Sequence, residues 1–361
     1  MKKISKTKSI LLCCSLLLSV LLITILYYVN PFSKKTEGNT RKYEVVKDRH
    51  IKKELTQIAD TLQIQILRYD VDIFSVDTSC LSKEIQRLSK RYPSFLIQPN
   101  AWQEDRYVEQ LRAFLKDPYI QEIYKDVTTI FPDFEEEEQE LKEAFVLYRY
   151  YFPSAKIPTF YTIVAGIDPS NAFIIPYGDN IIINLDWYLG ADYKYYQDYR
   201  IPQYIRLQCE KKQMTLDCFR RAIGYQLLPS RTPITLLDYM IENGKLLYFT
   251  ELMFPKRNTE EILSYTKEQL AWAEKYQPDV WNYLVENELL FSKDAVVARR
   301  LIEDAPFSNP FKNSPGRIGC YIGWKIVSNF MEKHPETSIS DLMKEENSRK
   351  ILDLSGYKPL K

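Results

Sequence analysis

Histidine and glycine are scarce in this sequence, and their scarcity removes several classes of active site. Two histidines, His50 and His334, occur among 361 residues. An HExxH metalloprotease needs two histidines four residues apart on one helix, and a Ser-His-Asp or Cys-His site needs one beside its nucleophile. The ten glycines form neither a phosphate-binding loop nor a G-x-S-x-G elbow. We therefore expect no metal site based on histidine, and the sequence indicates no cofactor.

Cysteine motifs are also missing. No Cys-x-x-Cys occurs, which argues against a zinc knuckle or a thioredoxin-like redox site. Four cysteines follow the N-terminal segment, and two of them, Cys209 and Cys218, are near enough in sequence to close a short disulfide loop in an oxidising compartment. Buried free thiols are the alternative interpretation.

Neither sign of charge is in large excess. Without the four lysines among the first eight residues, 45 basic residues face 48 acidic ones, so the formal charge falls from +1 to −3. Nucleic-acid binding usually needs a concentrated basic face, and we expect no nucleic-acid partner. The apolar content of 45% supports a sizeable core.

The N-terminus carries the clearest positive signal. Its lysines precede 21 residues without a charge, Ser9–Val29. At about 1.5 Å per residue this run is long enough to cross a hydrocarbon layer of about 30 Å. The lysines should remain in the cytoplasm, which places the C-terminal domain in the periplasm of the cell envelope. A cleaved signal peptide and a lipid-modified N-terminus are the alternatives, although the sequence has neither an Ala-x-Ala-like site nor a well-placed cysteine.

This signal divides the chain into four parts. We expect a cytoplasmic tail at 1–8, a transmembrane anchor at 9–29, a polar tether at 30–50 and an exported globular domain at 51–361. The domain has a mostly-α α+β pattern. Helices are predicted at about 81–91, 104–116 and 118–130, in a further segment that ends near Tyr151, and almost throughout after Arg200.

Two regions have β-strand patterns. Apolar residues alternate over 62–74 with a change of phase at Ile66-Leu67, which predicts a bulged strand or two short strands. Three β-rich runs within about 158–187, separated by Gly166 and by Tyr177–Asn180, predict a small antiparallel meander packed on the helices.

An acidic run, Glu135–Glu138, opens the helix that ends near Tyr151. Carboxylates are favoured at the positive end of a helix, so we interpret the run as a solvated first turn. A cation site is the alternative.

Aromatic residues surround the strongest catalytic candidate. Asp186 lies in Leu185-Asp-Trp-Tyr-Leu-Gly190, and six of the thirteen residues from Trp187 to Tyr199 are aromatic. With a second carboxylate such as Glu242, Asp186 could hydrolyse a glycosidic bond in a cleft lined by such rings. The alternative is that Trp187 and Tyr188 pack the end of the sheet against helices.

Two later helices have glycines on an apolar face. One is expected to begin at Thr232-Pro233 and to carry Gly244, next to Asn243 and Lys245. The other follows Pro315 and carries Gly319 and Gly323. Close helix packing explains these glycines best, because glycine in a helix costs about 1 kcal/mol relative to alanine. Arg317 stands at the start of the second helix, against the dipole, which favours a carboxylate partner or an anionic ligand.

Several segments, in this order and spacing, resemble the gliding-motility lipoprotein family GldB. The resemblance covers roughly Arg68 to Pro359 and rests on Arg68–Phe74, Tyr151–Pro153, Leu185–Gly190, Gly244–Phe249, Ala305–Phe307, Pro315–Gly319 with Ile322–Trp324, and Ser355–Pro359. It implies a cell-envelope protein linked to gliding and secretion. The family carries a lipid on a cysteine after its signal, and this chain has no clear counterpart of that cysteine.

The layout also resembles, more distantly, exported HExxH metallopeptidases. In those proteins a strand meander is followed by the HExxH helix, a helix that opens with Glu-Gly, and a Gly-Arg-x-Gly segment. Here the corresponding helix, 218–228, offers Arg220/Gly224 or Arg221/Tyr225, which are not zinc ligands, and Asn243 replaces the glutamate. The resemblance implies a zincin-like scaffold without its metal.

We therefore predict a membrane-anchored, non-catalytic envelope protein that binds a protein or peptide. The binding cleft would lie between the meander and the helices at 218–228 and 233–253. Its candidate residues are Trp187, Tyr188, Tyr225, Asn243, Lys245 and Arg317. The alternatives are an envelope hydrolase that uses Asp186 and Glu242, and a purely structural scaffold.

Overall fold

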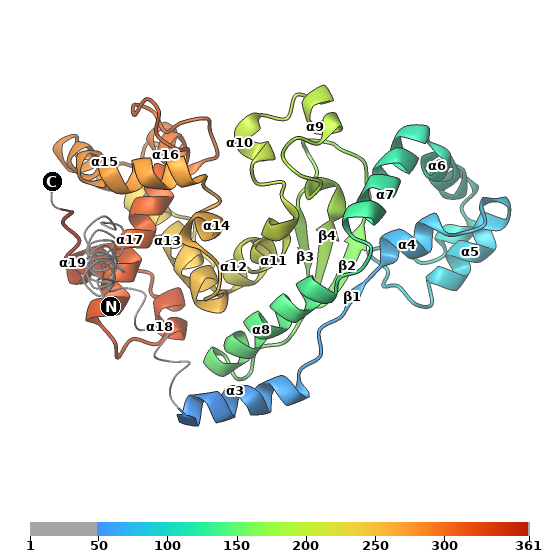
Figure 1. Ribbon diagram of the computed structural model, residues 1–361, viewed down its shortest axis with the longest axis horizontal. Helices are drawn as coiled ribbons and strands as arrows, with labels where there is room; N and C mark the ends of the chain where they lie inside the picture. Colours follow the sequence, from blue (N-terminus) through green and yellow to red (C-terminus); the bar gives the residue numbers. More distant parts are fainter. Residues whose placement is uncertain (1–48, 360–361) are drawn as a thin grey trace, which may run out of the picture. The chain divides into compact units, whose positions relative to one another are not determined.

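The structure is a computed structural model that describes residues 49–359. Helices make up most of this part of the chain (Figure 1). The first elements are α3 (Arg49–Thr61), β1 (Ile66–Leu67), α4 (Tyr69–Phe74), α5 (Leu81–Leu88), α6 (Asp105–Lys116), α7 (Pro118–Ile130) and α8 (Glu135–Tyr151). Three strands follow, β2 (Thr159–Ile163), β3 (Ile174–Tyr177) and β4 (Asn180–Asn184). The later α-helices are α9 (Lys194–Asp198), α10 (Gln203–Arg206), α11 (Met214–Asp217), α12 (Gly224–Leu227), α13 (Leu236–Met253), α14 (Thr259–Leu263), α15 (Lys267–Glu286), α16 (Ala295–Ile302), α17 (Ile318–Lys333), α18 (Ile339–Lys344) and α19 (Ser348–Ser355). The mostly-α α+β class is confirmed, and α5 to α8 lie where helices were predicted.

The predicted tail, anchor and nearly all of the tether lie outside the described residues. Within residues 49–359, no helix combines the length and the apolar character that a membrane span requires.

The strands form one mixed sheet in the order β1-β2-β4-β3. β3 and β4 make the antiparallel hairpin that the turn Tyr177–Asn180 predicts, but β2 runs parallel to β4. The antiparallel meander is therefore wrong. The connection 164–173, which turns at Gly166 with φ +87°, carries the chain beyond the position of β4 before β3 begins, so β4 enters the middle of the sheet.

The strand predicted over 62–74 is also mostly wrong. Only Ile66 and Leu67 pair with β2, and the chain then enters α4. The chain passes from β1 into α4 just before Asp70. The carboxylate of Asp70 is fully buried and accepts hydrogen bonds from Arg68 Nε at 2.9 Å and from Thr162 Oγ1 at 2.5 Å. These bonds hold the first turn of α4 against β2, and the change of apolar phase marks the point where the strand ends.

Helices α13 and α17 cross at the centre of the main core. A Cβ on Gly244 would lie 2.4 Å from the carbonyl carbon and oxygen of Gly323, and one on Gly323 would lie 1.8 Å from the carbonyl oxygen of Met240. Close helix packing is therefore the reason for these glycines. A second, smaller apolar cluster includes Leu81, Ile85 and Leu88 of α5.

The start of α13 differs from the prediction. Thr235, not Thr232, is the N-cap residue, and its Oγ1 accepts from the backbone N–H of Asp238 at 3.2 Å. Asp238 in turn accepts from the backbone N–H of Thr235 at 2.9 Å. This reciprocal capping box gives a side-chain acceptor to two backbone N–H groups. A helix that began at Thr232-Pro233 would not form it.

Candidate functional site

A π-helical segment, Cys218–Ile223, joins α11 to α12 in one continuous helix. Such wider turns occur often at functional sites. Two consecutive arginines in the segment, Arg220 and Arg221, both reach back to Asp217. Strands β3 and β4 and helix α13 all contact the segment, so it lies where the predicted cleft was expected.

Asp217 is fully buried and holds three partners. Its Oδ1 is 2.6 Å from Arg220 Nη2 and 3.1 Å from Arg221 Nε, and its Oδ2 accepts from the Tyr188 hydroxyl at 3.0 Å. Burial acts to raise the pKa of Asp217, but Arg221 and Arg220 outweigh it and hold this pKa below its ordinary value. The carboxylate is therefore a permanent anion between two cations.

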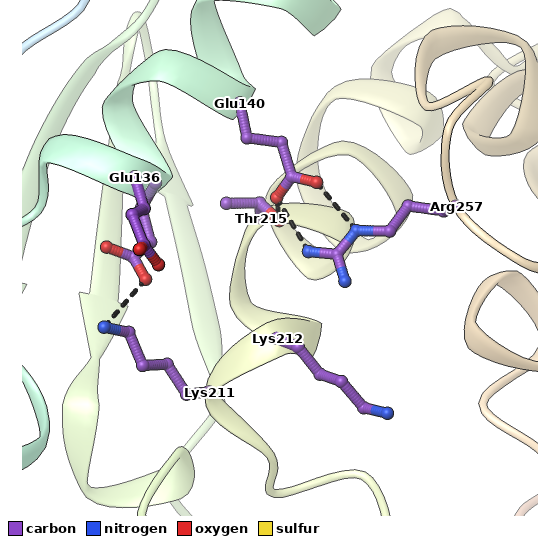
Figure 2. Close-up of a pocket in the computed structure, with 7 residues that line it drawn as sticks. Glu136, Glu140, Lys211, Lys212, Thr215 and Arg257 are labelled. Carbon is purple, nitrogen blue, oxygen red and sulfur yellow. Dashed lines mark hydrogen bonds and ion pairs between the residues drawn. The ribbon is translucent and has the colours of Figure 1, made fainter.

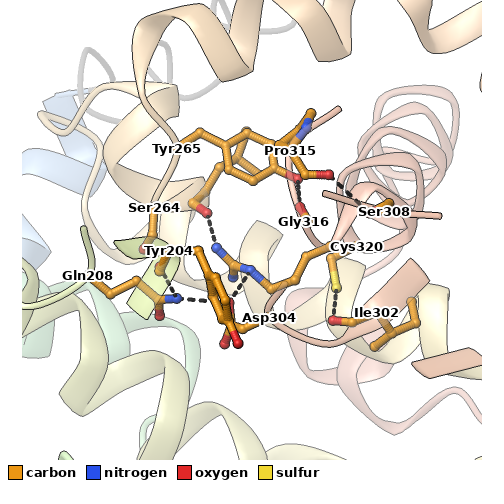
Figure 3. A network of polar contacts seen from close by, with 12 residues as sticks. Tyr204, Gln208, Ser264, Tyr265, Ile302, Asp304, Ser308, Pro315, Gly316 and Cys320 are labelled. Atoms are coloured by element: carbon orange, nitrogen blue, oxygen red, sulfur yellow. Dashed lines mark hydrogen bonds and ion pairs between the residues drawn. The ribbon is translucent and has the colours of Figure 1, made fainter. Parts of the chain in front are cut away.

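Hydrogen bonds and an ion pair continue the arrangement from Arg221 to Arg317, and Figure 3 shows Gln208 and Asp304, which lie between them. Gln208 accepts from Arg221 Nη2 at 2.9 Å and donates to Asp304 Oδ1 at 2.8 Å. Arg317 lies 2.8 Å from the same carboxylate oxygen and donates to the carbonyl of Leu263 at 2.8 Å. The prediction of a carboxylate partner for Arg317 is thus confirmed, and that partner is Asp304. We use the name charge network for six of these residues: Tyr188, Gln208, Asp217, Arg221, Asp304 and Arg317.

The charge network leaves little free space. A cavity of about 20 Å³ beside it is lined by Tyr204, Ser264, Tyr265 and Gly316, among others. That volume is near the size needed for a single water molecule. The arrangement fixes the π-helical segment, the 304–317 loop and α14 relative to one another and has no space for a substrate.

The two rings predicted to line a cleft belong to the core. Trp187 is 2% exposed and stacks between Phe173 and Tyr196, at centroid distances of 4.7 and 5.8 Å. Tyr188 is fully buried, and burial raises its pKa. They pack the end of the sheet, which was the alternative interpretation of the aromatic segment.

The two candidate catalytic carboxylates occupy different environments. Asp186 is fully buried, and one oxygen accepts from the backbone N–H of Ala165 at 2.7 Å while the other has no partner. Burial raises the pKa of Asp186 to about 7. Glu242 lies on α13, 3.7 Å from Arg231, and burial raises its pKa also. A fully buried Asp186 has no access to a polymer substrate.

The remaining cleft candidates differ in their contacts and exposure. Lys245 is buried and donates to the backbone carbonyls of Met343, at 3.5 Å, and of Glu345. Burial lowers its pKa to about 8. Asn243 donates to the Tyr239 carbonyl within α13. Tyr225 is 56% exposed. Lys245 thus fastens α13 to the end of α18 rather than lining a cleft.

The predicted disulfide is not formed. Cys209 and Cys218 are both free and fully buried. Burial raises the pKa of each thiol, which makes them poor nucleophiles.

A larger pocket lies elsewhere, at the start of α8, and we call it the α8 pocket (Figure 2). Its volume is about 420 Å³. It is lined by Glu136, Glu137, Glu140, Lys211, Lys212, Thr215 and Arg257. The sequence signal for this pocket was the acidic run, which we interpreted as a solvated turn. The basic side of the pocket comes from residues more than seventy positions later, so local pattern gave no reason to pair the two sides.

A comparison with known families agrees with the resemblance seen in the sequence. The family model for the gliding motility protein GldB matches residues 48–359, which include every residue that the structure describes. The chain belongs to the GldB family. Because this is a lipoprotein family, membership indicates a membrane-anchored location in the cell envelope. Neither the curated proteins nor the solved structures include a match.

Proposed function

We propose that this GldB-family protein is a non-catalytic component of an envelope or secretion assembly and binds an extended segment of a partner protein. The observation that supports the absence of catalysis is the pairing of Asp217 with Arg220 and Arg221. In the metallopeptidase-like layout this helix would have to present metal ligands. Guanidinium groups stay protonated in proteins and do not ligate zinc. Here both guanidinium groups pair with one buried aspartate, which supports a structural role for them.

The outer edge of β3, the last strand in the sheet order, is the surface that we propose for the partner. Phe173 accepts from the N–H of Asn184, so the odd-numbered residues of this strand bond to β4. The backbone groups of Ile174 and Pro176 consequently face away from β4. Since Pro176 has no N–H, the edge offers one donor and two acceptors, which is enough to hold a short extended peptide by strand addition. Tyr177, 55% exposed, ends the strand.

Photo-crosslinking in cells tests this proposal. p-Benzoylphenylalanine in place of Tyr177 should capture a discrete partner protein, which mass spectrometry then identifies together with the crosslinked segment. The matched control is the same probe in place of Phe291, an aromatic residue of similar exposure, 50%, that lies between α15 and α16. We expect the partner only from position 177.

Two results would contradict the proposal. Equal capture from both positions, or none from position 177, would leave a purely structural scaffold as the better description. Stoichiometric zinc in the purified full-length protein would overturn the non-catalytic part.

A further inference from the structure

The α8 pocket carries charges of both signs on opposite sides. Figure 2 shows Glu136 and Glu140 projecting from α8 and Lys211 and Lys212 from the facing segment. Counted over its lining, three glutamates oppose two lysines and one arginine, so the pocket is neutral but strongly polarised. A neutral ligand with separated charges matches such a pocket better than a net anion or cation does.

Some of these charges already satisfy one another. Glu140 accepts from Arg257 Nε at 2.7 Å and Nη2 at 2.8 Å and from Thr215 Oγ1 at 2.5 Å. Arg257 also pairs with Glu261 at 3.4 Å. These groups form a rigid wall, because each charge has a partner in good geometry, and they have little capacity left for a ligand.

Glu137 does have capacity left. Its side chain is 9% exposed, and Oε1 pairs with Lys211 at 3.1 Å. Its other oxygen, Oε2, is buried without a hydrogen-bond partner. A buried carboxylate oxygen needs a donor, and leaving it without one is costly. The neighbouring Glu136 is exposed and has no ion pair within the described residues. The α8 side therefore presents the exposed carboxylate of Glu136, next to a buried carboxylate of Glu137 that still lacks one donor.

The opposite side presents a cation with only a loose partner. Lys212 is 54% exposed, and its Nζ lies 3.6 Å from Glu261, which is already paired with Arg257. Its ammonium group is free to turn toward a carboxylate in the pocket. The volume of about 420 Å³ lies within the range of small-molecule sites.

From this arrangement we propose that the α8 pocket binds a short zwitterionic peptide, such as a free dipeptide. The peptide's ammonium group lies against Glu136, on the side of the pocket that Glu137 also lines, and its terminal carboxylate lies against Lys212. This site is separate from the β3 edge, and neither proposal depends on the other.

Calorimetric titration of the purified full-length protein with alanyl-alanine tests the site. We expect binding in the millimolar range or tighter. N-acetyl-alanyl-alanine and alanyl-alanine amide each lack one terminal charge. Each should bind at least about tenfold more weakly, since a charge-assisted hydrogen bond is lost.

Variants of the pocket make the test specific. Lys212→Met and Glu137→Gln should each weaken binding of alanyl-alanine at least about tenfold. Lys293→Met, at an exposed lysine outside the pocket, should leave it unchanged. Because Lys212 is on the surface, its variant should fold even if that of Glu137 does not.

Three outcomes would overturn the proposal. The first is no binding of alanyl-alanine to the wild-type protein, which would mean that water alone fills the pocket. The second is equal binding of the blocked peptides, and the third is a folded Lys212→Met variant that binds as the wild type does.

Discussion

Two buried aspartates illustrate how the surroundings of a single residue decide its charge. Asp217 is buried beside two arginines, and its pKa is held low. Asp186 is equally buried but has only backbone N–H donors on one oxygen, and burial raises its pKa to about 7. The same side chain is therefore a fixed anion in one place and titrates near neutral pH in the other.

Asp186 should make the protein less stable as pH rises. Its pKa in the folded state is above the ordinary value of 3.8, so between these two values the folded state binds more protons than the unfolded state. The free energy of unfolding then falls with rising pH and levels off above about 7. Asp186→Asn keeps an acceptor for Ala165 and removes the titration. In urea unfolding, the free energy of unfolding of the variant minus that of the wild type should increase by about 2–3 kcal/mol from pH 5 to pH 8. A difference that does not change with pH would contradict this assignment.

The buried thiols give a second prediction at this scale. Cys209, Cys218 and Cys320 are buried, and burial raises the pKa of Cys320 to about 12. Cys80 is partly exposed. In the native protein iodoacetamide should therefore label Cys80 well before the other three. After unfolding without a reductant, mass spectrometry should find label on Cys209 and Cys218. Their protection in the unfolded chain would show a disulfide.

Residue type and spacing reveal part of the site but not its partners. Arg317 was selected because a cation at a helix start is unusual, and its partner is indeed a carboxylate. Asp217 was passed over, although its spacing of three and four from Arg220 and Arg221 on one helix was visible in the sequence. Gln208 had no local signal, because it connects Arg221 to Asp304 only in the folded chain.

At the scale of elements, the crossing of α13 and α17 depends on two glycines. A methyl group at Gly323 would overlap the backbone of Met240, which cannot move without shifting α13. Gly323→Ala should therefore destabilise the protein by about 3 kcal/mol or more, beyond the usual cost of overpacking. Gly178→Ala is the matched control, since no atom lies within 4 Å of its added Cβ and only its φ of +56° opposes alanine, at about 1 kcal/mol. Similar melting temperatures for the two variants would contradict this packing argument.

Helices were easier to predict than the sheet for a physical reason. Amphipathic periodicity and caps are local, so α5 to α8 were found within a few residues. Strand order is not local. Short β-rich runs gave the hairpin of β3 and β4, but the parallel pairing of β2 with β4 depends on the path of the 164–173 connection. The two residues of β1 are too few for a periodic signal.

On the scale of the whole molecule, the charge network joins segments that are far apart in the sequence. Tyr188 follows the sheet, Asp217 ends α11, Arg221 belongs to the π-helical segment, and Asp304 and Arg317 flank the loop before α17. Gln208 is the only amide side chain in the charge network. It connects Arg221 to Asp304 through one hydrogen bond to each. The residue Gln208 is buried, at 3% exposure.

A double-mutant cycle tests whether the network acts as a unit. Gln208→Leu leaves Arg221 Nη2 and one bond of Asp304 unsatisfied and should cost about 1–3 kcal/mol. Arg317→Met removes the other partner of Asp304 Oδ1. Because both variants act on this one carboxylate, their effects on the free energy of unfolding should be non-additive by at least about 0.5 kcal/mol.

The control cycle combines Gln208→Leu with Arg91→Met, which removes the surface pair with Asp72. The effects of these two variants on the free energy of unfolding should add within about 0.5 kcal/mol. Additivity in both cycles would mean that the network is a series of independent contacts, and the fixed position of the π-helical segment would then need another cause.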